Sequence, residues 1–100
     1  MLETFRSYQL AVQFYQLTKT QKAPRHLKGQ LLRASSSIAL NLSEGSAKRS
    51  RADRRRFYEI ALASTRECEA LVELLLPQSA PLLELLDKLA RHNVKLVKAL

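Results

Sequence analysis

The 100-residue sequence is poor in the residues on which many small folds depend. Its single cysteine excludes a disulfide framework and a cysteine-based zinc site. Two glycines and three prolines supply too few turns for a fold of many short strands. The longest run without a charged residue, Ser7 to Thr18, has twelve residues, fewer than the roughly 18 that a membrane span needs. We therefore expect no association with a membrane.

The start of the chain also lacks a targeting signal. Met1 to Thr4 contain no basic segment ahead of an apolar block, which a signal peptide requires. A cytoplasmic location is therefore expected. With 46% apolar and 26% charged residues in 11.4 kDa, the composition is typical of one globular domain covering residues 1–100.

What the sequence does contain is an excess of positive charge concentrated in one place. The net charge is +8, and the nine residues from 48 to 56 account for +5 of it. A basic protein of this kind favours an anionic partner such as nucleic acid. We call this cluster the basic corner; its cations are Lys48, Arg49, Arg51, Arg54, Arg55 and Arg56.

Turn-forming residues divide the chain into four helical stretches. Thr4 is expected to cap the first, and Pro24 suits the first turn of the second. Gly45 is expected to end the second helix in a left-handed conformation. Ser50 to Asp53 has the pattern of a capping box that opens the third helix. A short break around Pro77 precedes the fourth.

Each stretch carries apolar residues at steps of three and four, as an amphipathic helix does. Short connections between such helices favour an all-α, antiparallel up-down four-helix bundle. The faces expected to form the core include Phe5, Tyr8, Val12 and Tyr15, widened by Phe14 and Leu17, then Leu31, Ala34, Ile38 and Leu42, then Phe57, Ile60, Ala61, Ser64, Cys68 and Leu71, and last Leu82, Leu86, Leu89, Ala90, Val94 and Val97.

A second pattern lies beside the apolar face of the second helix. Five polar residues, which we call the polar stripe, also recur at steps of three and four: Gln30, Arg33, Ser37, Asn41 and Glu44. A solvated surface is one interpretation. Because serine and asparagine are poor helix formers in solvent, we favour a half-buried hydrogen-bond network, either within the bundle or between subunits. Arg33 is expected to form a partly buried pair with Glu44 or Glu67.

The polar stripe also carries a family resemblance. The pattern Q-L-x-R-A-x-x-S-I-x-x-N-x-x-E-G, a basic loop and F-x-x-I-A-x-x-S-x-x-E-x-E resembles the four-helix bundle proteins encoded by 23S rRNA intervening sequences. That family includes the Avd accessory proteins of diversity-generating retroelements. The matching residues are Gln30, Arg33, Ala34, Ser37, Ile38, Asn41, Glu44, Gly45, Phe57, Ile60, Ala61, Ser64, Glu67 and Glu69.

The resemblance implies a bundle that assembles as a ring-like homopentamer. Avd-type members are thought to bind nucleic acid and the reverse transcriptase of their retroelement, whereas most other members have no settled function, so the resemblance indicates the architecture better than the partner. The proline-marked connection after Leu76 is short for the family, which leaves the placement of the fourth helix open.

Catalytic chemistry has few candidate residues here. Cys68 lies on the expected core face, where a free cysteine behaves as a small hydrophobic residue. His26 and His92 have no partner three or four residues away that would complete a helical metal pair. We therefore expect no enzymatic activity, no cofactor and no metal site.

Two functions from different classes remain for the basic corner. Arginine forks suit phosphates, so the first is nucleic-acid binding, with RNA favoured over DNA and no base-specific recognition. The second is a protein-interaction adaptor whose partner, such as a reverse transcriptase, carries the activity. A third interpretation, a purely solubilising face, explains less well why cations gather where they oppose a helix dipole.

The stripe and the resemblance together predict self-association. We expect light scattering at micromolar concentrations to return about five times the 11.4 kDa of one chain. A constant mass of about 11 kDa across that range would contradict the expected homo-oligomer.

Overall fold

A computed structural model describes residues 2–100, with side chains from Arg6 onward. It consists of the helices α1 (Leu2–Lys19), α2 (Arg25–Ala47), α3 (Arg51–Leu75) and α4 (Ala80–Lys98). The described residues contain no strand, so the expected all-α class is confirmed. The helices form an elongated bundle of 40 × 22 × 18 Å. None of these helices is both long and apolar enough to cross a membrane.

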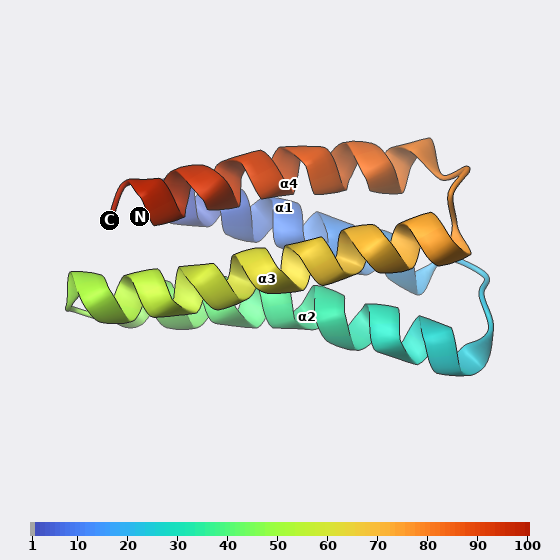
Figure 1. Ribbon diagram of the computed structural model, residues 1–100, viewed down its shortest axis with the longest axis horizontal. Helices are drawn as coiled ribbons and strands as arrows, with labels where there is room; N and C mark the ends of the chain where they lie inside the picture. The colour runs from blue at the N-terminus through green and yellow to red at the C-terminus, as the bar shows by residue number, and fades with distance from the viewer. Residues whose placement is uncertain (1) are drawn as a thin grey trace.

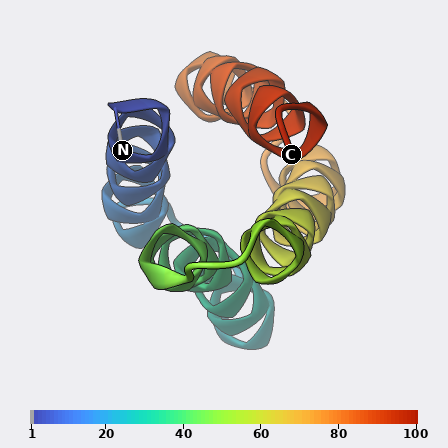
Figure 2. The ribbon, with the colours of Figure 1, turned by 90° about the vertical axis from the view of Figure 1, so that its left-hand side faces the viewer.

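The helices are arranged around a common axis, and each packs against two neighbours. Contacts join α1 to α2, α2 to α3, α3 to α4 and α4 back to α1. The connections from α1 to α2 and from α3 to α4 lie at one end of the bundle (Figure 1). The turn from α2 to α3 lies at the other end, together with both ends of the chain (Figures 1 and 2).

The expected helix starts are correct where a local interaction defines them. Ser50 caps α3, because its Oγ accepts a hydrogen bond from the Asp53 N–H at 3.1 Å. Pro24 directly precedes α2, and Pro81 lies in the first turn of α4, where a missing N–H costs nothing. Thr4 is not a cap, because α1 already begins at Leu2.

The sequence pattern predicted that α2 ends at Gly45, and this prediction is wrong. The helix continues to Ala47, and no glycine has a positive φ. Gly45 is instead buried against α3, where an added Cβ would lie 2.6 Å from Tyr58 Cε1 and 3.1 Å from Phe57 Cβ. Glycine is favoured here because any larger side chain would overlap the Tyr58 ring and force it to move.

The core extends along the whole bundle and differs from the expected faces at a few positions of α1 and at the start of α3. In α1 Phe14 is buried as expected, together with Leu10 and Ala11, whereas Tyr8 is exposed; the side chain of Phe5 is outside the described residues. In α3 Tyr58 is buried and Ile60 is 40% exposed. Some buried positions of these helices are polar (Ser7 and Thr18 in α1, Thr65 in α3), so a search for recurring apolar residues does not identify them.

One polar contact crosses the core between α3 and α4. Asn93 Nδ2 donates to Thr65 Oγ1 at 3.1 Å, and Thr65 Oγ1 donates to the Ala61 carbonyl at 2.8 Å. Asn93 and Thr65 are fully buried. Such a pair contributes to the register of two helices, because a shift would leave buried polar groups unpaired. The sequence pattern missed Asn93, which it did not assign to the core.

Replacement by alanine should have opposite effects on the free energy of unfolding at the two glycines of α2. Gly45→Ala should lower the free energy of unfolding by about 1–3 kcal/mol, because the buried Tyr58 ring must move. Gly29→Ala should raise it by about 0.5–1 kcal/mol, because Gly29 is an exposed helical position with no atom within 4 Å of an added Cβ. Urea denaturation followed by circular dichroism measures both. Equal effects would contradict the close approach at Gly45.

Candidate nucleic-acid interface

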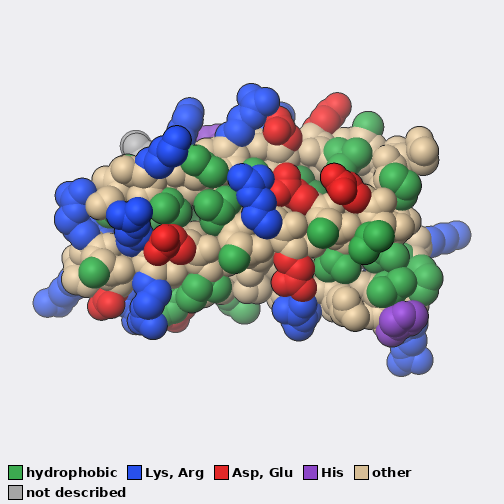
Figure 3. Space-filling model, in the orientation of Figure 1, with side chains coloured by type: hydrophobic (Ala, Val, Ile, Leu, Met, Phe, Trp, Pro, Cys, Tyr) green, Lys and Arg blue, Asp and Glu red, His purple; other side chains and the backbone are tan. Residues whose placement is uncertain are grey.

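The turn between α2 and α3 positions the basic corner. Only residues 48–50 connect the two helices. The Lys48 N–H donates to the Gly45 carbonyl at 3.2 Å, which closes α2, and Ser50 opens α3. The chain therefore reverses direction with little slack, and the cations on both sides of the turn are gathered at one end of the bundle (Figure 3).

Phe57 organises two of these cations. Lys48 Nζ lies 5.2 Å from the centroid of the Phe57 ring, and Arg56 Cζ lies 4.7 Å from the same centroid. Both distances are within the range of cation–π attraction, which contributes roughly 0.5–1 kcal/mol at exposed sites. One half-buried ring thus holds cations from the end of α2 and from the first turns of α3 close together.

The basic corner is only weakly neutralised by nearby carboxylates. Lys48 Nζ lies 3.5 Å from Glu44 Oε2, and Arg55 Nε lies 4.0 Å from Glu59 Oε2. Both pairs are exposed, and such pairs contribute little. Arg49 has no ion pair with any described side chain. The positive charge is therefore available to an external anion.

Two other arginines have a more structural setting. Arg51 Nη2 donates to the Ala99 carbonyl at 3.2 Å, which ties the start of α3 to the end of α4. Cations are favourable near the C-terminus of a helix. Arg54 is half-buried, and its Nε is buried without a hydrogen-bond partner among the described atoms. Arg54 therefore contributes to packing as well as to charge.

The structure adds cations to this end that the sequence analysis missed. Lys95 and Lys98 lie in the last turn of α4, and Arg6 lies near the start of α1, at the end of the bundle that also holds the turn between α2 and α3 (Figure 1). Burial lowers the pKa of His92 below its ordinary value of 6.5, and the charges of Arg6 and Lys95 lower it further. His92 is thus neutral at pH 7 and adds no charge.

The polar stripe forms a hydrogen-bond network within one bundle. Ser37 Oγ and Ser64 Oγ lie 2.9 Å apart and join α2 to α3. Asn41 Nδ2 donates to the Ser37 carbonyl at 2.9 Å and to Ser37 Oγ at 3.1 Å. Of the two expected locations for a network, within the bundle or between subunits, this one lies within the bundle.

Arg33 pairs with Glu67, one of its two expected partners, through Arg33 Nη2 and Glu67 Oε2. The expectation of a partly buried pair is wrong, because the two side chains are 62% and 42% exposed. Glu44 instead contacts Lys48 in the basic corner, and Gln30 is exposed. The outer members of the stripe are solvated because both helices turn this edge away from the core.

Almost the whole length of the chain matches one known protein family. A model of the family described as "23S rRNA-intervening sequence protein" matches residues 4–100. The chain belongs to this family. The match confirms the resemblance that the polar stripe and the basic loop indicated.

A solved structure of the same kind supports the family assignment. It is a protein of unknown function from the S23 ribosomal protein family of Bacteroides thetaiotaomicron, 25% identical to this chain with a TM-score of 0.64. The similarity covers 97% of this chain and 93% of that chain. No curated protein matches.

In this family member Cys68 is unsuited to nucleophilic chemistry. The side chain is fully buried. Burial, with a smaller contribution from the charge of Glu67, raises the pKa of the Cys68 thiol to about 12. The reactive thiolate is therefore almost absent at neutral pH. Among the described residues, no group of three or more His, Cys, Asp and Glu side chains could hold a metal ion.

The exposure of the Arg33–Glu67 pair predicts a small effect on stability. Exposed pairs contribute under about 1 kcal/mol, so Arg33→Ala should lower the free energy of unfolding by no more than that. Arg91→Ala, which removes an exposed pair with Asp87 on α4, is the matched control and should behave alike. Urea denaturation measures the free energy of unfolding of both variants. A decrease for Arg33→Ala several times larger than for Arg91→Ala would contradict the exposed geometry.

Proposed function

We propose that this intervening sequence protein is a non-enzymatic, oligomeric protein of the cytoplasm that binds nucleic acid through residues 48–56. The observation that carries the proposal is the basic corner. It places six cations around one turn, and only Lys48 and Arg55 among them form ion pairs with described side-chain carboxylates, both of them exposed. Arginine presents several donors in a rigid fork that matches phosphate oxygens. Such contacts orient a nucleic acid but carry no sequence information.

The cost of the arrangement argues against a purely solubilising role. Cations in the first turn of a helix oppose its dipole, at about 0.3–1 kcal/mol each when exposed, and Arg54, Arg55 and Arg56 also repel one another. Solubility needs charge, but it does not need charge at this position. An anionic ligand would relieve both the repulsion and the dipole conflict.

RNA is favoured over DNA as the ligand. The family description refers to 23S rRNA, which associates its members with rRNA genes and their transcripts. RNA recognition that relies on phosphate contacts responds to shape and strandedness more than to base sequence. We therefore expect weak sequence preference.

We further propose that antiparallel up-down bundles assemble into a ring-like homo-oligomer, with five subunits as the resemblance implies. Leu40 on α2 and Leu74 on α3 are 65% and 79% exposed, and burying them against another subunit would be favourable. A ring would repeat the basic corner around its axis and so multiply the phosphate contacts.

The alternative function is a protein adaptor. The same cations would then contact an acidic surface on a partner such as a reverse transcriptase, as the Avd-type members suggest. The exposed leucines would fit this function as well as they fit self-assembly, because a protein partner could bury them. The two functions differ in whether nucleic acid alone binds to the pure protein.

A salt series tests nucleic-acid binding. Each phosphate contact contributes about 0.7–0.9 to the slope of log affinity against log salt concentration, because bound counterions are released. One subunit that uses most of the basic corner should give a slope of roughly −3 to −5. The variant R49Q/R55Q/R56Q should reduce that slope by about 2–3 and weaken binding at every salt concentration. Fluorescence anisotropy with a labelled RNA measures both quantities.

The control variant K22Q/R25Q/K88Q removes the same charge from exposed positions away from the basic corner. It should keep the wild-type slope. Arg54 is left unchanged because its half-buried side chain also packs. Absence of RNA binding by the wild type at low salt would contradict nucleic-acid binding and favour the adaptor function. Equal losses in the two variants would contradict a localised site.

A further inference from the structure

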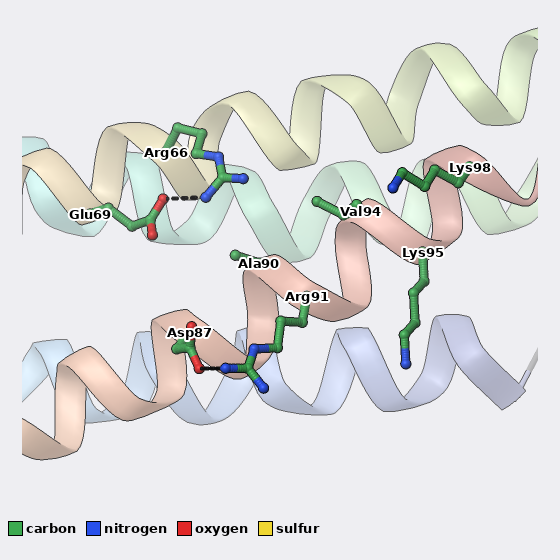
Figure 4. Close-up of a pocket in the computed structure, with 8 residues that line it drawn as sticks. All are labelled: Arg66, Glu69, Asp87, Ala90, Arg91, Val94, Lys95 and Lys98. Carbon is green, nitrogen blue, oxygen red and sulfur yellow. Dashed lines mark hydrogen bonds and ion pairs between the residues drawn. The ribbon is translucent and has the colours of Figure 1, made fainter.

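An open groove runs between α3 and α4 on the surface of the bundle. Its volume is about 600 Å³, and Figure 4 shows the side chains that line it. Ala90 and Val94 contribute small apolar side chains from α4, and charged side chains rise on both sides. No aromatic side chain is among its lining residues. The groove can therefore hold a charged chain but offers no surface for base stacking.

The end of the groove near the C-terminus of α4 is positively charged. The Lys98 side chain runs back along α4 toward Val94 (Figure 4) and has no ion pair with a described side chain. Farther along, Arg66 on α3 is exposed, and its Nη1 lies 2.9 Å from Glu69 Oε1. Arg91 forms a similar pair with Asp87 at 3.0 Å. Each pair occupies one amino group of its arginine and leaves others for a further anion.

This positive end is continuous with the basic corner. Arg51 at the start of α3 donates to the carbonyl of Ala99, the residue that follows Lys98. The cations of the corner and those of the groove therefore lie on the two sides of a single contact. A polyanion bound to the corner therefore meets further cations on the α4 side of this contact.

Carboxylates limit the groove at its other end. Glu69 and Asp87 line it opposite Lys98 (Figure 4). Asp87 is eleven residues from Lys98 along α4, which is about 16 Å at 1.5 Å per residue. Because each carboxylate is paired with an arginine of the groove, the net positive charge decreases toward this end.

We infer that the α3–α4 groove holds the phosphate backbone of single-stranded RNA that continues from the basic corner. The inference rests on the proposed nucleic-acid binding and names its substrate class. Axes of packed helices lie about 8–10 Å apart, so a duplex is too wide to enter between α3 and α4 and contacts the corner alone. A single strand follows a positively charged groove by its backbone. Strandedness is therefore recognised by groove width.

Removal of the groove cations should lower the affinity for single-stranded RNA, which tests the inference. R66Q/K98Q should weaken binding of a short single-stranded RNA by roughly threefold or more and reduce its salt slope by about 1.4, for two lost contacts. Binding of a duplex of the same sequence should change by less than about twofold, because the duplex does not reach the groove. The control K22Q/K88Q removes two exposed lysines outside the groove and should leave both affinities unchanged.

A gain of affinity tests the same groove without the risk of misfolding. Glu69→Gln frees Arg66 inside the groove, whereas Glu67→Gln, two residues earlier, frees Arg33 outside it. Each change raises the net charge by one. Only Glu69→Gln should strengthen single-strand binding, by roughly twofold or more, and neither should alter duplex binding.

The outcomes separate the groove from the corner. Loss of binding in R49Q/R55Q/R56Q together with unchanged binding in R66Q/K98Q would overturn the groove and leave the proposed function intact. Equal effects of R66Q/K98Q on single strand and duplex would overturn the selection by strandedness. Absence of any RNA binding by the wild type would overturn both proposals.

Discussion

The close approach of α2 and α3 is the contact on which the candidate interface depends. Gly45 has no side chain, so the ring of Tyr58 packs against the backbone of α2. Farther along, the hydroxyls of Ser37 and Ser64 meet at 2.9 Å, which also needs small side chains on both helices. With the two axes this close, a connection of three residues suffices. This short connection brings cations from both helices around Phe57.

The neighbouring contact between α3 and α4 has the opposite character. It is fixed in the core by Thr65 and Asn93, but its outer edge carries Arg66 and Arg91, whose charged ends remain in solvent. Long charged side chains cannot close over each other as two serines do, because each keeps its hydration. One edge of α3 is therefore sealed by small polar groups, and the other remains an open groove.

Local interactions explain which parts of this fold could be predicted from sequence. The cap at Ser50 depends on one hydrogen bond three residues away, and Pro24 acts through its own fixed φ. The partner of Arg33 was found as one of two alternatives, because opposite charges at the edges of adjacent helices are few. The basic corner could be identified because its cations are neighbours in sequence, although its role in binding is a proposal.

The amino-acid sequence by itself determined the all-α class, the approximate extent of the helices, the family and the location of the charge. Only the tertiary structure decided that Gly45 is a packing position, that Tyr58 rather than Ile60 enters the core, and that Arg51 contacts the end of α4 at Ala99. Helix formation and capping depend on residues within about one turn. Burial and the meeting of distant charges depend on the spacing and rotation of whole helices, which are set by the packing of all four together.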